Sequence, residues 1–521
     1  MIRKIILFLG ISLFLFFLPP CLQGETEKPV EEKPAFELPE VVIIGEDQSR
    51  VTIGGERKPL VDQPFLRKVE VGLEPVGKIS LLSLPLGKDI NITEINFGYG
   101  RFETLKGGLT HGRQIKDKGH YLLGIGKYKT DGEFSDRHYN IDDAFLEVGF
   151  RPGEKLDLKI ATSGLLKDYR LSNSTITQKI DLLNLELGAK AKIKEEGSLG
   201  CQFFGRIGNL KNDSKASGDI GGLRLQAGIG FGQGNVFNLE AQLYQERLKL
   251  DGDRRRYLVS SISLSQEFLL FDKVWANLGV EYKEKSKPFS SLIFPTARFS
   301  YELIPNFSLW VRYKPEMIVP SFDELYIAND YVDVNLNLLP EKRKFSLEEG
   351  MEYKLGQNLS GSISFFQKKF KNFIAIFDDG RLGNLQNIPK VYSQGVDASF
   401  IYILRKNFTQ QLRYVYQKTE DEDRPDERVP YTPSHTVRIS SHYSYGPLSV
   451  LLSALIESER YYNRSESLPL YWTMETEISC NITKQVILYL QGENLLREKY
   501  AERFGYPLDH TKFLGGFKVK W

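Results

Sequence analysis

The chain of 521 residues has few of the side chains that most often bind metals: three cysteines, four methionines and six histidines. Cys21, Cys201 and Cys480 lie far apart and form no CxxC pair, so the sequence shows neither a disulfide framework nor a zinc signature. The histidines show no metal-ligand spacing either. We therefore predict no cofactor, no metal site and no catalytic residue, and we do not expect an enzyme.

The chain also lacks long apolar runs and an excess of either charge. After the N-terminal segment, no run reaches the ~18 consecutive apolar residues that indicate a transmembrane helix. A charged content of 26% and a mean hydropathy of −0.31 argue against a helical membrane protein. The 69 basic and 67 acidic residues leave a formal net charge of +2, so we expect no general affinity for nucleic acid.

Residues 1–24 are typical of a secretory signal peptide. Arg3 and Lys4 precede the apolar run 5–18, which is shorter than the ~20 residues of a comfortable membrane span. We expect cleavage near Gly24. Cys21 leaves lipoprotein processing as an alternative, although the prolines before it are not the small residue expected there.

The chain is rich in aromatic residues and in alternation of apolar and polar positions. It has 33 Phe, 26 Tyr and 45 Gly, a composition typical of β structure. The run EINFGYG places Ile95, Phe97 and Tyr99 on one face, and NLELGAKAKI (184–193) and FNLEAQLY (237–244) alternate in the same way. A period of two predicts strands with one apolar and one polar face. The pattern continues from about residue 92 to Trp521, in segments long enough for transmembrane strands of ~9–11 residues.

The connections between these segments fall into two classes. Tight turns such as RPGEK (151–155) and YGP (445–447) alternate with longer connections. The longer connections are 315–344, 371–390, 419–433, 457–470 and 496–510. This alternation predicts an all-β fold, a transmembrane antiparallel up-and-down β-barrel of about 22 strands in the outer membrane, over residues 92–521. An even number of strands places both ends of the barrel on the periplasmic side.

The last strand has one apolar face. In TKFLGGFKVKW (511–521), the residues Phe513, Phe517, Val519 and Trp521 alternate with Leu514 and two lysines. We interpret these four residues as the lipid-facing side of the strand that closes the barrel.

Several stretches resemble the barrel of TonB-dependent receptors. PSFDELY (320–326) precedes LNLLPEKRKFSLEEGMEYKL (336–355), and GENLLREKY (492–500) follows near the end, in the order of that family. The resemblance covers roughly residues 305–521. It implies an outer-membrane transporter that takes up a scarce ligand, such as a ferric siderophore, cobalamin or another metal chelate, captured by external loops such as 315–344. It also implies that outer-membrane assembly machinery recognises the terminal aromatic residue.

The run PEVVIIG (39–45) is similar to the Ton box of that family. By this resemblance, Glu40, Val41, Val42, Ile43 and Ile44 are the residues that TonB would hold by strand addition. A generic β-prone tail, or a segment packed in the barrel mouth, is the alternative. The domain prediction is a signal peptide (1–24), a periplasmic segment (25–91) and the barrel (92–521).

The sequence departs from the family in one respect. Only residues 47–91 separate the Ton-box-like run from the first expected strand, too few for a full plug domain. Three explanations remain open: residues 48–91 partly fill the lumen, a separate protein closes it, or strands and loops of the barrel fold inward. The alternative function is a plug-less passive pore or a structural barrel.

A basic tripeptide, Arg254-Arg255-Arg256, lies beside an expected external loop. It indicates either a solvated rim or a contact with anionic lipopolysaccharide. The partners we expect are therefore outer-membrane lipid and lipopolysaccharide, TonB and the assembly machinery, around a monomeric barrel.

Overall fold

The computed structural model describes residues 90–521, except for short stretches at 116–117, 133–137, 171–176, 194–196, 213, 232–234, 271–272, 287–289, 328–331, 357, 379–381, 406 and 509. The predictions for the signal peptide (1–24), for the Ton-box-like residues Glu40–Ile44 and for the periplasmic segment up to residue 89 therefore lie outside the described residues; residues 90 and 91 belong to the first strand. No helix in the described part of the chain is long and apolar enough to cross a membrane.

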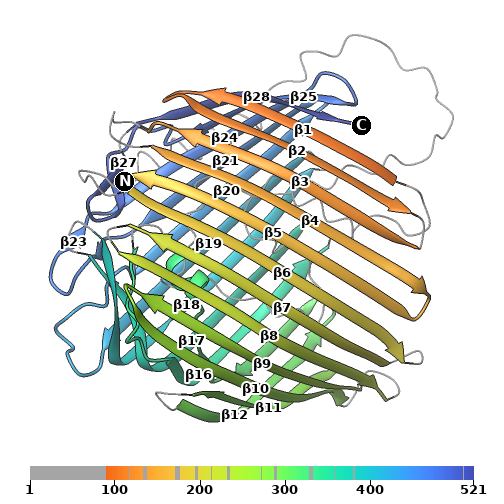
Figure 1. Cartoon of the computed structure of the whole chain (residues 1–521), viewed down its shortest axis with the longest axis vertical. Coiled ribbons are helices and arrows are strands. Elements are labelled where there is room, and N and C mark those ends of the chain that lie inside the picture. Colours follow the sequence, from red (N-terminus) through yellow and green to blue (C-terminus); the bar gives the residue numbers. More distant parts are fainter. Residues whose placement is uncertain are drawn as a thin grey trace. The chain divides into compact units, whose positions relative to one another are not determined.

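The described residues are almost entirely strands (Figure 1). The first thirteen are β1 (Ile90–Gly100), β2 (Thr104–Ile115), β3 (Gly119–Thr130), β4 (Tyr139–Gly153), β5 (Leu156–Arg170), β6 (Thr177–Ile193), β7 (Gly197–Lys211), β8 (Lys215–Gly230), β9 (Val236–Leu250), β10 (Asp253–Leu270), β11 (Val274–Lys285), β12 (Ser290–Ile304) and β13 (Phe307–Tyr313). The others, with one π-helical turn η3, are β14 (Glu316–Ile318), η3 (Asp323–Ile327), β15 (Val332–Asp333), β16 (Glu341–Leu355), β17 (Leu359–Phe377), β18 (Gly383–Arg405), β19 (Phe408–Asp421), β20 (His435–Tyr445), β21 (Leu448–Glu457), β22 (Arg460–Tyr461), β23 (Ser467–Leu468), β24 (Tyr471–Asn481), β25 (Val486–Glu493), β26 (Tyr500–Arg503), β27 (Tyr506–Leu508) and β28 (Lys512–Lys520).

The main sheet closes on itself. Barrel strands that follow one another along the chain pair antiparallel. The last strand, β28, pairs with both β25 and β1. Backbone bonds between Thr93 and Trp521, 2.8 and 3.0 Å long, hold the two ends together. Among the described residues this sheet has 24 strands; β14 and β15 are short additions to it, which leaves 22 barrel strands. The prediction of an antiparallel barrel of about 22 strands is confirmed, and its first strand begins at Ile90.

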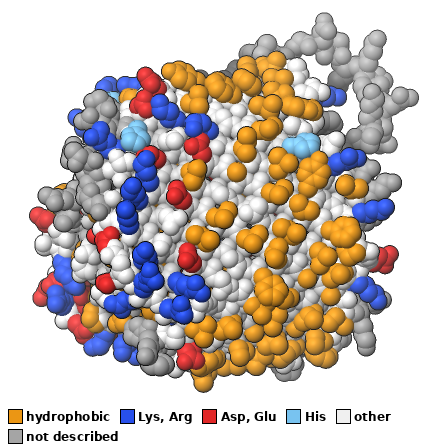
Figure 2. Space-filling view, viewed as in Figure 1, with side chains coloured by type: hydrophobic (Ala, Val, Ile, Leu, Met, Phe, Trp, Pro, Cys, Tyr) orange, Lys and Arg blue, Asp and Glu red, His pale blue; other side chains and the backbone are white. Residues whose placement is uncertain are grey.

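Apolar side chains cover the outer face of the barrel. Ile95, Phe97 and Tyr99 are exposed on β1, and Leu183, Leu185 and Leu187 are exposed on β6. Figure 2 shows such side chains as a broad band across the strands. The alternate positions carry polar residues such as Glu94, Asn96 and Asn184. This is the pattern of a membrane barrel. Its apolar side chains face lipid on the outside, and its polar side chains face the lumen.

The two ends of the barrel differ. At the turn end, most connections are tight; Gly356 (φ 60°) and Gly446 (φ 56°) take the left-handed conformation that such turns favour. At the loop end, β13 and β16 are joined by residues 314–340, and β25 and β28 by residues 494–511. The first residue of β1 and the last residue of β28 both lie at the turn end of the barrel.

The expectation of a long loop at 371–390 is wrong. β17 continues to Phe377 and β18 begins at Gly383, so most of that stretch is paired strand. The physical reason is burial: Phe373, Ile374, Ile376, Leu385 and Ile388 are at most 7% exposed. These apolar residues continue the two strands beyond the wall because they pack against other chain segments rather than meeting water.

Candidate functional site

The loop that joins β13 to β16 folds into the barrel. This segment, residues 314–340, contains β14, η3 and β15 and is called the inward loop. Its η3 turn contacts β6 and β7, where Figure 1 shows it behind the front strands. The wall residues that meet it, such as Leu210 and Glu246, alternate with the exposed Ile207 and Leu243 on the same strands. The inward loop therefore lies on the lumen side of the sheet.

Small residues in the wall make room for the inward loop. On β8, Ala216 is buried against the loop, and a Cβ atom on Gly218 would overlap the Cβ and Cγ atoms of Phe322. On β7, a side chain on Gly208 would meet Ile327 and Phe322 in the same way. The loop backbone can lie this close to the sheet only because those positions have little or no side chain.

Polar contacts fix the inward loop to the wall. The Arg206 guanidinium lies 2.8 Å from an Asp323 carboxylate oxygen. The Phe322 backbone N–H donates to the Glu246 carboxylate, at 2.8 Å, although Glu246 is only 1% exposed. The Tyr257 hydroxyl donates to the Leu336 carbonyl at 3.3 Å. A buried carboxylate needs such a donor. Leaving a buried polar group without a hydrogen-bond partner costs about 1–3 kcal/mol, and the cost is larger for a charged group.

The inward loop connects two separate parts of the wall. One hydrophobic cluster joins Tyr169, Ile180 and Leu210 of β5–β7, the loop, and Ile374, Ile376 and Leu385 of β17 and β18. On the second wall, the Asn335 side chain donates to the Leu385 carbonyl at 2.8 Å, and the Leu339 N–H donates to Asn387 at 2.7 Å. Strands β8–β13 and β16 lie between these two parts in the order that the pairings give, and the loop also contacts β9 through Glu246 and β10 through Tyr257. The loop therefore crosses the lumen as a chord.

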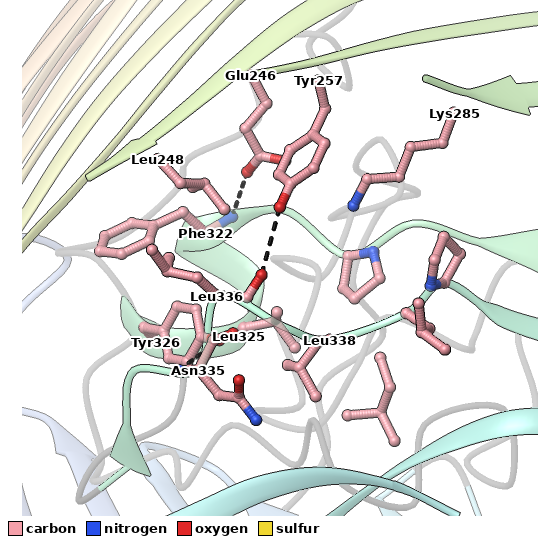
Figure 3. Close-up of a pocket in the computed structure, with 14 residues that line it drawn as sticks. Glu246, Leu248, Tyr257, Lys285, Phe322, Leu325, Tyr326, Asn335, Leu336 and Leu338 are labelled. Carbon is pink, nitrogen blue, oxygen red and sulfur yellow. Dashed lines mark hydrogen bonds between the residues drawn. The ribbon is translucent and has the colours of Figure 1, made fainter. Parts of the chain in front are cut away.

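A pocket lies between the inward loop and β9–β11 (Figure 3). It has about 380 Å³ of empty space, part of it open to solvent. Its polar side chains include Glu246, Tyr257, Lys285 and Asn335, and the Lys285 ammonium lies 3.9 Å from the centre of the Tyr257 ring. Leu248, Leu336 and Leu338 supply apolar surface. The pocket therefore has both polar and apolar lining, and it runs along one side of the inward loop.

Tyr326 secures the inward loop to itself. Its hydroxyl donates to the Asn335 carbonyl at 2.8 Å, and the side chain is 1% exposed. Burial raises the pKa of Tyr326 well above its ordinary value, so the phenol remains a hydrogen-bond donor over the physiological range.

Four further loops are tied together at the loop end. Asp378, between β17 and β18, accepts hydrogen bonds from Tyr431, between β19 and β20, and from Arg503 of β26. Burial first, and then the negative charge of Asp378, raise the pKa of Tyr431. Arg464, between β21 and β24, pairs with Asp421 at 3.0 Å and with Glu427.

Aromatic rings join the same loops. Tyr462 stacks on Phe504 at 3.9 Å between ring centres, with 4° between the planes, and Tyr471 stacks on Tyr500 at 4.6 Å. These stacks, together with the ion pairs, join the loops to one another at the loop end. Within the described ranges, no group of three or more His, Cys, Asp or Glu could hold a metal ion.

Of the predicted site residues, the structure describes those of the closing strand and not those of the Ton-box-like run. On β28 and at its end, Phe513, Phe517 and Trp521 are exposed on the outer face and Val519 is half-buried; their contact with lipid stays a prediction. Glu40, Val41, Val42, Ile43 and Ile44 are outside the described residues. The expectation of an external loop at 315–344 is corrected by the structure, because the middle of this stretch lies in the lumen. Sequence analysis missed Arg206 and Glu246; the apolar spacing of Phe322, Leu325 and Tyr326 was the available signal.

Comparison with known proteins gives one family and a common fold. The family model described as "TonB dependent receptor-like, beta-barrel" matches residues 87–495. The copper transporter OprC is 11% identical (TM-score 0.70), the ferric-catecholate import receptor Fiu from E. coli K12 is 12% identical (0.69), and the siderophore receptor PiuA from Acinetobacter baumannii is 11% identical (0.70). Each comparison covers 84% of this chain and 82% of the other. No curated protein matches by sequence.

Proposed function

Because the chain belongs to the TonB-dependent receptor β-barrel family of the outer membrane, we propose that it takes up a scarce ligand in an energised manner. The ligand class we infer is a metal chelate: a ferric siderophore, cobalamin or a similar complex. Binding at the loop end would precede passage through the lumen.

The observation that carries this proposal is the inward loop. A segment that crosses the lumen and is fixed to both walls obstructs free diffusion, so passage of a large ligand requires the loop to move. The contacts that hold the loop make its displaced state a minor one, so ligand binding or another input of free energy is needed to populate that state. A device of this kind suits an energised transporter better than an open pore.

The ligand class is supported by structural neighbours of the same fold. Two are described as receptors for a ferric catecholate and for a siderophore, and one is described as a copper transporter. All three proteins are named for a metal or a metal-binding compound.

We assign the energy input to TonB, acting on Glu40–Ile44. An extended β-branched run can add as a strand to an exposed sheet edge, where backbone bonds transmit tension. On the same reasoning, Phe513, Phe517, Val519 and Trp521 face lipid, and assembly machinery recognises the end of β28. Segments 1–24 and 25–91 act as signal peptide and periplasmic arm, and the barrel works as a monomer.

The test is uptake by cells in which this protein is the sole route for a labelled ferric chelate. Removing Val41–Ile44 should abolish energy-dependent accumulation and leave surface binding intact. Removing residues 29–32, from the Pro- and Glu-rich stretch nearby, provides a control of equal length. Unchanged accumulation after the first deletion would refute the role of the Ton-box-like run.

A second function, a passive pore or structural barrel, is favoured by one observation. Residues 47–91 are too few for a full plug domain, so the part of the chain between the Ton-box-like run and the barrel supplies little material to close the lumen. Conductance measurements separate the two functions.

A further inference from the structure

Lys285 is a buried cation beside the inward loop. It is the last residue of β11 and is 6% exposed, and its ammonium lies over the Tyr257 ring. In the part of the chain that the structure describes, this ammonium forms no ion pair and no hydrogen bond. Burying an ammonium without a hydrogen-bonded partner carries a desolvation cost. The barrel with the loop in its lumen is therefore less stable than it would be with an apolar residue at this position.

Glu246 carries the opposite charge on the same stretch of wall. The register places Glu246 opposite Tyr257, and Lys285 opposite Val259, so the two charged residues are two strands and two positions apart. This places their Cα atoms ~12 Å apart, a distance that a lysine and a glutamate side chain can span together. Both side chains line the pocket, and Figure 3 shows Tyr257 between them.

The inward loop holds these side chains in separate contacts. The Phe322 N–H donates to the Glu246 carboxylate, and the Leu336 carbonyl accepts from the Tyr257 hydroxyl. If the loop leaves the wall, Glu246 loses its donor and Tyr257 loses its acceptor, while Lys285 loses its apolar cover. The Glu246 carboxylate then needs a new partner, and the Lys285 ammonium is a cation within reach of it.

We propose that Lys285 is a release residue for the inward loop. Its ammonium lacks an acceptor among the described residues while the loop is docked, and it pairs with Glu246 once the loop leaves. Lysine suits this role because it carries a compact charge on a flexible stem. A residue that is unfavourable in one state and gains a partner in the other reduces the free-energy difference between them. The inference rests on the proposed function only in that transport requires the loop to move.

The experiment measures how often the inward loop leaves the wall. Ser321 lies in the loop and is 7% exposed, so Ser321→Cys should react with a maleimide chiefly when the loop is displaced. The labelled protein is the mature chain in detergent, with Cys201→Ser and Cys480→Ser. Lys285→Met is introduced into this protein. The control is Lys283→Met, which removes the same charge two positions earlier on the same face of β11.

We expect Lys285→Met to slow labelling about tenfold, because an apolar side chain of similar volume stabilises the docked state and the ion pair of the displaced state is lost. Lys283→Met should leave the labelling rate unchanged. In a protein that also carries Glu246→Gln, the Lys285→Met substitution should slow labelling much less, because the pair is already absent. Equal slowing with and without Glu246→Gln would refute the pairing. Faster labelling after Lys285→Met would show that Lys285 holds the loop in place, which also overturns the proposal.

A second measurement does not depend on the folding of these variants. In a form whose residues 320–338 are replaced by a short Gly-Ser linker, a crystal structure should place the Lys285 ammonium ~3 Å from a Glu246 carboxylate oxygen. An ammonium that still lies over the Tyr257 ring would overturn the proposal. Uptake of a labelled ferric chelate, measured separately, reports on the proposed transport function, so the two proposals can fail independently.

Discussion

At the scale of single residues, the lumen side of the wall is shaped around one segment. Gly218 and Gly208 leave space that Phe322 and Ile327 occupy, and Glu246 places a buried acceptor where the loop offers a backbone N–H. None of these residues stands out in the sequence, because a glycine or a glutamate in a barrel strand is ordinary. Their role follows only from the contact with a segment about 100 residues away, which no local pattern encodes.

Gly218→Val should displace the inward loop. The added side chain would overlap Phe322 close to its backbone, where neither partner can move aside cheaply, and we expect a loss of about 1–3 kcal/mol in the free energy of unfolding. Limited proteolysis of the inward loop provides the measurement. Gly221→Val is the matched control: it lies on the same strand, and a Cβ atom there meets nothing within 4 Å. Equal effects from both substitutions would show that the close fit at Gly218 is not what matters.

Glu246→Ala and Glu246→Gln should differ. Alanine leaves the buried Phe322 N–H without its acceptor, which costs about 1–3 kcal/mol, whereas glutamine retains a carbonyl oxygen in the same place. Chemical unfolding of the two variants measures the difference. If glutamine is as damaging as alanine, the negative charge rather than the acceptor is required, and Lys285, which lines the same pocket, becomes the partner to test.

At the scale of elements, the barrel strands could be predicted and the loop-end structure could not. Alternation of apolar and polar residues in stretches such as 184–193 predicts a strand with one face toward lipid. The residues predicted for that face, Leu185 and Leu187, are exposed. The expectation failed at 371–390 and 315–344, where apolar residues are buried against each other beyond the membrane wall. Alternation indicates which residues share a face; it does not indicate which distant segment covers that face.

Arg503→Ala should loosen the network of loops at the loop end. It removes a charged donor from Asp378, a carboxylate that also holds Tyr431, so the loops that carry these residues lose a common partner. Removing one partner of a largely buried ion pair costs about 3–5 kcal/mol in well-buried cases, and we expect the lower end here. Hydrogen exchange in residues 426–434 and 500–505 is the measurement.

Lys499→Ala removes the same charge from an exposed neighbour of that network and is its control. If exchange rises equally in both variants, net charge at the loop end rather than the Asp378 contact controls the loops. If it rises in neither, the ring stacks between Tyr462 and Phe504 and between Tyr471 and Tyr500 are sufficient to hold them.

At the scale of the whole molecule, the family and the barrel follow from pattern and motif, while closure of the lumen is a question of contacts. Of the three explanations left open by the sequence, the structure supports an inward fold of barrel segments, since the inward loop joins β5–β8 to β17 and β18. The lumen of a barrel of 22 strands is wide, so a single loop that crosses it leaves space on either side. The chord obstructs large solutes more effectively than it obstructs ions.

Conductance in planar bilayers separates a gated transporter from a pore. We expect the mature protein to conduct little, and a form without residues 25–91 to conduct more if that segment fills space beside the chord. Replacing residues 320–338 by a short Gly-Ser linker should raise conductance further, because it removes the contacts to both walls. Shortening residues 423–427, in another loop at the same end, is the control for loss of loop mass. A large, equal conductance in all four proteins would mean that the lumen is open throughout, and energised uptake would then be the wrong function for this barrel.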